Sequence, residues 1–449
     1  VLTGECIARN VDGSCVHAST SGRVTAIGAA AVPGPAGMRA TCVDIEADGQ
    51  DTLHPDCRPP PDYHDMSPEQ ILGEIAAAGI LGLGGAMFPT AAKLATRDPA
   101  RALIVNGAEC EPYISCDERL MRERPGDVIR GTEIMLRALD CEHAVIALES
   151  DMPEARVALQ EFLEASDSPR IRVAVVTAKY PAGGERQLIE LLTGREVPAG
   201  GLPQDAGYLC QNVATAAAVA AWFERGQPLI SRIVTVTGDC VRQPVNVEAR
   251  IGTPLADVLA MAGGLKEPPA KLIMGGPMMG YEIAGAELPV TKACNCLLAA
   301  AAGELGEALA EYPCIRCGQC SDACPARLLP QMLLGACDHD DTPAMAQLGL
   351  DACIECGCCD VVCPSHIPLT ATFVRAKQAL RVAHTAQAVA ERARAASEAH
   401  ERRLEQIARE QQHALADQDA RVADPDAGAA ELAALVERSG AREGGNEQH

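Results

Sequence analysis

Hydrophobic and polar positions along the first 60 residues form short alternating runs, broken by glycine and proline. The clearest alternation runs from Cys15 to Ile27. A period of two is typical of a strand with one buried face, so we expect a small β-sandwich over residues 1–60. Three prolines within Arg58–Asp62 then predict a linker, because proline lacks the N–H that helices and inner strands need.

Apolar strands alternate with helical stretches after the linker. Ser67 is a good N-cap with Pro68 at the first helical position, which predicts a helix from there towards Gly79. The pattern predicts strands at 102–105, 143–148 and 171–176 and helices at about 127–139 and 153–165. This rhythm indicates an α/β layer fold with a largely parallel sheet over residues 66–228.

The pattern changes again at residue 230. Strands at 232–237, 244–248 and 271–274 and a helix near 254–262 predict a compact α+β unit over 230–300. Short helical pieces surround clustered cysteines over 305–370. Ala, Glu, Arg and Gln then dominate 371–425, which predicts a long helix, either solvated or binding a partner. Residues 426–449 are expected to be a disordered tail.

Composition narrows the class of protein. Hydrophobic residues make up 48% of the chain, yet it holds only six Tyr, four Phe and one Trp, so its cores are aliphatic. The net charge of −23 repels phosphate backbones, and no basic cluster offsets it, so no nucleic-acid partner is expected. Uncharged stretches at 75–92 and 206–223 are interrupted by glycine, proline or amides, so we expect no membrane span; no signal peptide is recognised.

Eight of the 21 cysteines occur as two copies of one spacing, Cys-x2-Cys-x2-Cys-x3-Cys-Pro. In this spacing three thiolates hold one four-iron four-sulfur cluster and the fourth ligates the other cluster. The sequence therefore predicts two 4Fe–4S clusters with crossed ligands. The first set is Cys314, Cys317, Cys320 and Cys363, and the second is Cys353, Cys356, Cys359 and Cys324.

The alternative for these cysteines is a pair of zinc sites. Zinc ribbons use two Cys-x2-Cys pairs per metal rather than this compact quartet. Cys358 is off the spacing and is interpreted as a packed thiol, as are the scattered cysteines. So many thiols in a long chain point to metal in a reducing compartment.

A glycine-rich segment precedes the first predicted strand of the α/β region. Backbone N–H groups of Gly82, Gly84 and Gly85 could approach a phosphate, Phe88 follows them, and Lys93 could add charge. The segment has no Walker spacing, so a structural glycine turn is the alternative interpretation.

Further polar motifs follow predicted strand ends or open helices, where open α/β sheets bind phosphorylated ligands. Their amides and carboxylates could hold a ribityl chain or a ribose. For Glu185 and Asn212 a simple cap or turn remains the alternative. The candidate residues in these motifs are Asn106, Glu109, Glu111, Tyr180, Gly183, Glu185, Asn212 and Thr215.

The order of these motifs resembles that of the NADH-binding flavoprotein subunit of respiratory complex I. Three further features resemble the C subunit of the Rnf (or Rsx) electron-transport complexes. They are the N-terminal segment with His17-Ala-Ser-Thr-Ser-Gly-Arg-Val-Thr-Ala, the paired cluster motifs, and Gly275-Gly-Pro-Met-Met-Gly280. The resemblance covers the chain up to about residue 370.

This resemblance implies a multidomain α/β and α+β protein. Its parts would be an N-terminal barrel-sandwich module, a Rossmann-like domain for FMN and NAD(H), a β-grasp (soluble-ligand-binding) domain, an α-helical dicluster ferredoxin domain and a C-terminal helix. It also implies an NADH/ferredoxin oxidoreductase subunit of a translocase, which couples electron transfer to Na⁺ or H⁺ movement. Such a subunit lies on the cytoplasmic side of the cell inner membrane, with the other subunits and a ferredoxin or flavodoxin-type carrier as partners.

The resemblance also assigns roles. Lys93, Asn106, Glu109 and Asn212 would contact FMN, and Glu185 would serve the nicotinamide side as the catalytic candidate. Ala108 stands where the complex I family has an acidic side chain. Ala108 favours one alternative, an electron-relay and docking subunit without its own flavin. A second alternative is a soluble NADH dehydrogenase or hydrogenase flavoprotein subunit.

Overall fold

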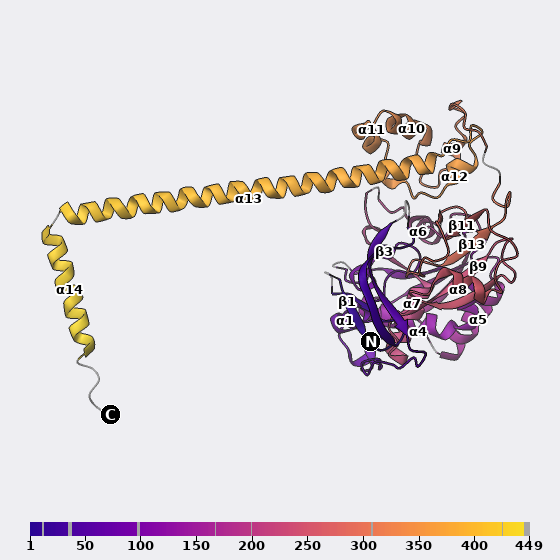
Figure 1. Cartoon of the computed structure of the whole chain (residues 1–449), viewed down its shortest axis with the longest axis horizontal. Coiled ribbons are helices and arrows are strands. Elements are labelled where there is room, and N and C mark those ends of the chain that lie inside the picture. The colour runs from indigo at the N-terminus through magenta and orange to yellow at the C-terminus, as the bar shows by residue number, and fades with distance from the viewer. Residues whose placement is uncertain are drawn as a thin grey trace. The chain divides into compact units, whose positions relative to one another are not determined.

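The structure is a computed structural model that describes residues 1–10, 13–34, 38–96, 99–166, 168–198, 200–306, 309–423 and 425–443. The chain divides into two units, and the first, Val1–Val374, holds every strand found among these residues (Figure 1). The second unit begins at Arg375 and is helical.

The N-terminal module consists of two antiparallel hairpins. The strands are β1 (Cys6–Arg9) with β2 (Cys15–His17), and β3 (Gly22–Ala31) with β4 (Arg39–Ala47). The predicted run from Cys15 to Ile27 is thus divided between two hairpins. Gly22 starts the second one, and a Cβ there would lie 2.1 Å from the Glu46 carbonyl oxygen, so close pairing at this point requires glycine.

A four-stranded parallel sheet follows the linker, in the order β7-β6-β5-β8, as the α/β pattern predicts. Its strands are β5 (Ala102–Gly107), β6 (Ala144–Glu149), β7 (Ile171–Val176) and β8 (Tyr208–Asn212). The sequence did not reveal β8 as a strand, because its five residues run directly into a helix with no loop between them.

Helices cover both faces of this sheet. Leu103 and Val105 of β5 point into the core under α4 and α7, whereas Ile104 packs with Leu188 of α6 on the other face. The capping box at Ser67 confirms the predicted helix start. The helices of this region are α1 (Pro68–Ala77), α2 (Thr90–Leu94), α3 (Cys116–Glu123), α4 (Pro125–Ala138), α5 (Pro153–Ser166), α6 (Glu185–Thr193) and α7 (Val213–Arg225), with short 3-10 turns at Tyr63–Asp65 and Pro203–Ala206.

A five-stranded mixed sheet, in the order β10-β9-β13-β11-β12, forms the next layer and carries one helix, α8 (Leu255–Met261). The sequence pattern missed the central strand β13, because all five of its residues are buried and show no alternation. The strands are β9 (Ser231–Thr237), β10 (Val245–Arg250), β11 (Lys271–Met274), β12 (Tyr281–Glu282) and β13 (Cys296–Ala300).

Short helices surround the clustered cysteines: α9 (Gln319–Asp322), α10 (Pro330–Asp338), α11 (Thr342–Gln347), a 3-10 turn at Leu350–Ala352, and α12 (Cys358–Val361). The expected long helix is α13 (Leu369–Ala423). The expected disordered tail is wrong for Pro425–Glu443, which forms α14; a proline at its first position and an alanine- and glutamate-rich run favour the helix. Residues 444–449 lie outside the described residues. None of the described helices is long and apolar enough to cross a membrane.

Candidate functional site

The eight motif cysteines line two separate cavities. Cys314, Cys317 and Cys320 share the first cavity with Cys363, and each cavity measures about 350–360 Å³ with its mouth included. The second cavity is lined by Cys353, Cys356, Cys359 and Cys324, with Cys358 beside them. Each cavity thus takes three thiols from one copy of the motif and one from the other, which is the crossed grouping that the spacing predicts.

The two copies also repeat the same backbone path. Arg316 and Glu355 occupy equivalent places between the first two cysteines, and both have left-handed φ, 55° and 59°. The residues three positions after the last cysteine, Arg327 and His366, match in the same way, at 54° and 53°. Non-glycine residues rarely adopt this conformation, so its recurrence shows that each copy is wound tightly around its cavity.

A second candidate site lies at the carboxyl edge of the parallel sheet. Asn106 and Asn212 face each other at the ends of β5 and β8, and the Asn212 side-chain amide approaches the Asn106 carbonyl oxygen at 3.5 Å. The Asn106 amide donates to the Gly183 carbonyl at 2.8 Å. A Cβ on Gly84 would lie 3.3 Å from the Asn212 side chain, so the glycine-rich loop meets Asn212. Ligands of open α/β sheets bind at this edge.

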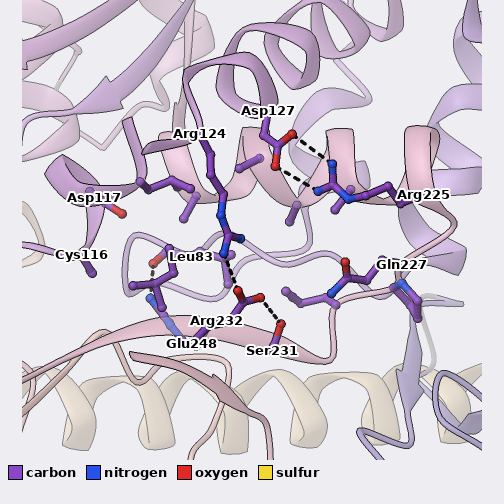
Figure 2. Close-up of a pocket in the computed structure, with 18 residues that line it drawn as sticks. Leu83, Cys116, Asp117, Arg124, Asp127, Arg225, Gln227, Ser231, Arg232 and Glu248 are labelled. Atoms are coloured by element: carbon purple, nitrogen blue, oxygen red, sulfur yellow. Dashed lines mark hydrogen bonds and ion pairs between the residues drawn. The ribbon is translucent and has the colours of Figure 1, made fainter. Parts of the chain in front are cut away.

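The glycine-rich loop is held through the backbone N–H and carbonyl groups of one residue, Leu83. The Leu83 N–H donates to the Thr215 hydroxyl at 2.9 Å. The Leu83 carbonyl accepts from the Arg232 guanidinium at 3.2 Å (Figure 2). Gly85 has φ of +108° and open space around its Cα, whereas Phe88 is 54% exposed. Thr215 and Arg232 therefore fix the loop through the backbone of Leu83. The sequence did not reveal Arg232 as a site residue, because a single arginine in an alternating strand carries no motif.

Lys93 and Glu185 form one ion pair. The Lys93 Nζ lies 2.5 Å from the Glu185 carboxylate, and both side chains are partly exposed. Lys93 comes from α2 and Glu185 opens α6. The sequence assigned Lys93 to FMN and Glu185 to the nicotinamide, and the fold places the two side chains in direct contact.

The partners of Glu109 lie at the start of α3. Its carboxylate accepts from the backbone N–H groups of Asp117 at 3.0 Å and Glu118 at 3.1 Å, and from the Cys116 thiol at 3.2 Å. Burial, and next the neighbouring Asp117 carboxylate, raise the pKa of Glu109 to about 8. The Asp117 carboxylate in turn accepts from the Asn212 amide at 2.5 Å. Glu109 therefore caps the N-terminus of α3 and positions Asp117 against Asn212.

Glu111 and Tyr180 connect this domain to its neighbours. The Glu111 carboxylate accepts from the backbone N–H groups of Met278 at 2.7 Å and Met279 at 2.9 Å. A Cβ on Gly276 would lie 2.1 Å from the Glu111 side chain, which explains the glycine there. The Tyr180 hydroxyl donates to the carbonyl of Cys356 at 2.6 Å, so the second cysteine set adjoins the α/β domain.

A further pocket, about 660 Å³ with its mouth included, lies between α3, α7 and β9 (Figure 2). Two of its three arginines are ion-paired: Arg124 with Glu248 at 2.6 Å, and Arg225 with Asp127 through two contacts of 3.0 Å. The third, Arg232, donates to the Leu83 carbonyl. Because all three arginines already have partners within the chain, we interpret the pocket as a seam between the two sheet domains.

Comparisons with known proteins cover most of the chain. Residues 75–221 match the Nuo51 FMN-binding domain, residues 233–282 an SLBB domain, and residues 1–50 the RnfC barrel sandwich hybrid domain. The C subunit of the ion-translocating oxidoreductase complex of Rhodobacter capsulatus is 43% identical over 387 residues, which are 85% of this chain and 73% of the relative. The chain belongs to this family of C subunits.

Other members of the family are similar as well. The corresponding protein of Pseudomonas aeruginosa is 50% identical over 341 residues, 74% of this chain and 43% of the relative. That of Pasteurella multocida is 45% identical over 363 residues, 81% of this chain and 43% of the relative. The chain thus spans about two fifths of the length of these two relatives.

The residues present fit the cofactors of such a chain. The match to an FMN-binding domain covers the glycine-rich loop, both asparagines and the Lys93–Glu185 pair. Open space above Gly85 and the two asparagines at the sheet edge suit a flavin phosphate and ribityl chain. Each cysteine cavity offers four thiols, the ligand set of a 4Fe–4S cluster. The cofactors of this chain are therefore FMN and two 4Fe–4S clusters.

Proposed function

We propose that this chain exchanges electrons with NAD(H) and passes them to or from the other subunits of a membrane-bound, ion-translocating complex. In this proposal it is a peripheral subunit on the cytoplasmic side of the inner membrane, and a ferredoxin or flavodoxin-type carrier is the other redox partner. The relatives' description as subunits of an ion-translocating oxidoreductase complex supports the assignment. The coupled ion is Na⁺ or H⁺.

A single observation carries the electron-transfer proposal. Tyr180, which opens the Tyr180–Glu185 motif, also hydrogen-bonds the second cysteine set, with its hydroxyl 2.6 Å from the Cys356 carbonyl oxygen. FMN exchanges electron pairs with a nicotinamide and single electrons with a cluster, which makes it the converter that the two other cofactors need. The contact through Tyr180 therefore supports electron exchange between the flavin-binding domain and the adjoining cluster.

The chain's own residues would each have a defined part. The loop N–H groups, Asn106 and Asn212 would hold FMN, and the eight cysteines would hold the clusters. Thr215 and Arg232 fix the loop through Leu83. Glu185 would orient Lys93 through their ion pair and would also contact the bound nicotinamide. Glu109 and Glu111 would act as positioning residues.

Anaerobic purification followed by FMN, iron and sulfide quantification and NADH titration tests the proposal. We expect stoichiometric FMN whose visible absorption bleaches with NADH. A protein with full iron content and no flavin would instead establish the relay and docking alternative, and a flavin that stays oxidised would refute the nicotinamide role. Release of all the protein from membranes by a low-salt wash would support the soluble flavoprotein alternative.

A further inference from the structure

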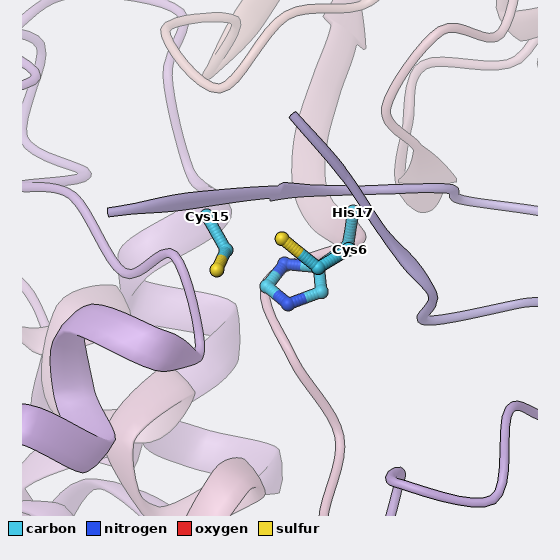
Figure 3. Close-up of side chains that lie close together, drawn as sticks. All are labelled: Cys6, Cys15 and His17. Atoms are coloured by element: carbon cyan, nitrogen blue, oxygen red, sulfur yellow. The ribbon is translucent and has the colours of Figure 1, made fainter. Parts of the chain in front are cut away.

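Three metal-ligating side chains outside both candidate sites converge in the N-terminal module. The Cys6 and Cys15 thiols and a ring nitrogen of His17 all lie within 4.8 Å of one another (Figure 3). Neither copy of the cysteine motif includes them, and they are not among the residues assigned to the FMN site at the edge of the parallel sheet. We propose that Cys6, Cys15 and His17 bind a Zn²⁺ ion.

The hairpin brings these side chains together. Cys15 and His17 lie two residues apart on β2 and therefore project from the same face. Cys6 on β1 is the cross-strand partner of His17, so its side chain joins that face. The three donors thus come from adjacent strands of one hairpin, and their convergence depends on its register.

The His17 imidazole has an unused nitrogen in this cluster. Its Nδ1 atom is buried and has no hydrogen-bond partner, which costs free energy unless something occupies it. Figure 3 shows the ring beside both sulfur atoms. A neutral imidazole nitrogen is the commonest side-chain ligand of metals in proteins.

The donor set and its spacing suit zinc. Two thiolates and one imidazole form a soft, nitrogen–sulfur environment that Zn²⁺ prefers over Mg²⁺ or Ca²⁺. With Zn–S bonds of about 2.3 Å, tetrahedral geometry separates two sulfurs by about 3.8 Å. The two sulfurs therefore need to approach by about 1 Å at most. Water would complete the fourth position, since Cys6 is exposed.

Two cationic side chains lie near the Cys15 thiol. They are Arg9 and Lys292, whose positive charges favour a thiolate over a thiol at Cys15. Lys292 is anchored beside the cluster by donating to the Gly79 carbonyl at 2.7 Å. Binding would replace one proton on each thiol by a bond to zinc, so two protons leave for each Zn²⁺ that binds, and affinity should rise with pH.

The geometry around Gly79 suggests what the ion would do. A Cβ on Gly79 would lie 2.2 Å from the Cys15 carbonyl oxygen and 3.2 Å from the His17 Nδ1 atom, so this hairpin packs tightly against the end of α1. A bound ion would link both strands of the hairpin at this contact. Its role would be to hold the N-terminal module on the α/β domain.

Zinc quantification on the anaerobic holoprotein tests the proposal. The protein is incubated with equimolar Zn²⁺, freed of excess by gel filtration, and analysed for zinc and iron by mass spectrometry. We expect about one zinc per chain in the parent protein, and at least a tenfold loss in Cys15→Ser and His17→Gln with unchanged iron. Cys42→Ser is the matched control, because Cys42 lies in the same module outside the cluster, and should keep its zinc.

X-ray absorption at the zinc edge of the parent protein keeps the test valid if a variant fails to fold. Two sulfur ligands at about 2.3 Å and one imidazole would support the site. Four sulfur ligands would place the ion in a cluster cavity and overturn the proposal. Zinc retained equally by every variant, or a Cys6–Cys15 disulfide in place of a bound ion, would overturn it too.

Discussion

The Tyr180 hydroxyl donates a 2.6 Å hydrogen bond to the backbone carbonyl of Cys356, across 176 positions of sequence. Burial, and next the Glu111 carboxylate, raise the pKa of Tyr180 above its usual value, so the hydroxyl stays protonated and remains a donor. This bond attaches the second cysteine set, rather than the first, to the domain with the flavin crevice.

Tyr180→Phe removes this bond and leaves the ring. We expect the free energy of unfolding to fall by about 1 kcal/mol and the amides of residues 353–359 to exchange faster with deuterium, while residues 314–320 exchange as before. Tyr312→Phe is the control, since Tyr312 is 60% exposed. Equal effects in both cysteine segments would contradict a local role for Tyr180.

The crossed grouping of the cysteines predicts which cluster each fourth ligand serves. Cys363→Ala should disturb the cluster of Cys314, Cys317 and Cys320, and Cys324→Ala the other one. Each variant should lose about half of the iron and a different electron paramagnetic resonance signal. Cys358→Ala should leave both signals intact. Loss of the same signal in both variants would rule out the crossed arrangement.

Thr215→Val takes away the acceptor of the buried Leu83 N–H. An unpaired buried donor costs about 1–3 kcal/mol, so the glycine-rich loop should loosen and FMN affinity should fall by about tenfold. Thr215→Ser keeps the hydroxyl and should bind nearly as well. Flavin fluorescence during FMN titration measures both, and equal binding by Val and Ser variants would show that the loop does not depend on this bond.

Gly85→Ala tests the loop's backbone directly. Gly85 has φ of +108°, and no atom lies within 4 Å of the position that a Cβ would take. An alanine there would meet no steric clash with neighbours, but its backbone conformation would be strained by about 1 kcal/mol. We expect about fivefold weaker FMN binding and an unchanged fold. Gly73→Ala is the matched control, because Gly73 also has open space but lies inside α1. Unchanged FMN affinity in Gly85→Ala would count against the loop as the phosphate site.

Stability should depend on pH through Glu109. Its folded-state pKa of about 8 exceeds the ordinary 4.5, so the folded protein holds an extra proton between these values. The free energy of unfolding therefore falls as pH rises through this window. The part of this fall that is due to Glu109 exceeds about 1 kcal/mol. Glu109→Gln should flatten the profile between pH 5 and 8 in chemical denaturation. A variant that follows the parent curve would assign the pH dependence elsewhere.

The eight motif cysteines could be grouped from the sequence alone, because their spacing is local and the crossed fourth ligand follows from the motif's duplication. The parallel sheet was predictable for the same kind of reason, since each strand and helix shows its own period. β8 and β13 were missed, one because no loop separates it from its helix and the other because both its faces are buried.

Only the tertiary structure decided what the remaining side chains touch. Lys93 joins Glu185 across 92 positions, and Glu111 reaches Met278 across 167. Arg232 supports the glycine-rich loop across 149 positions, and no motif marks it. Spacing along the chain describes near neighbours, whereas these distant partners are set by how the layers of the fold pack together. The sequence therefore determined which cysteines share a cluster. Only the tertiary structure determined how the FMN site is built and how it is joined to the clusters.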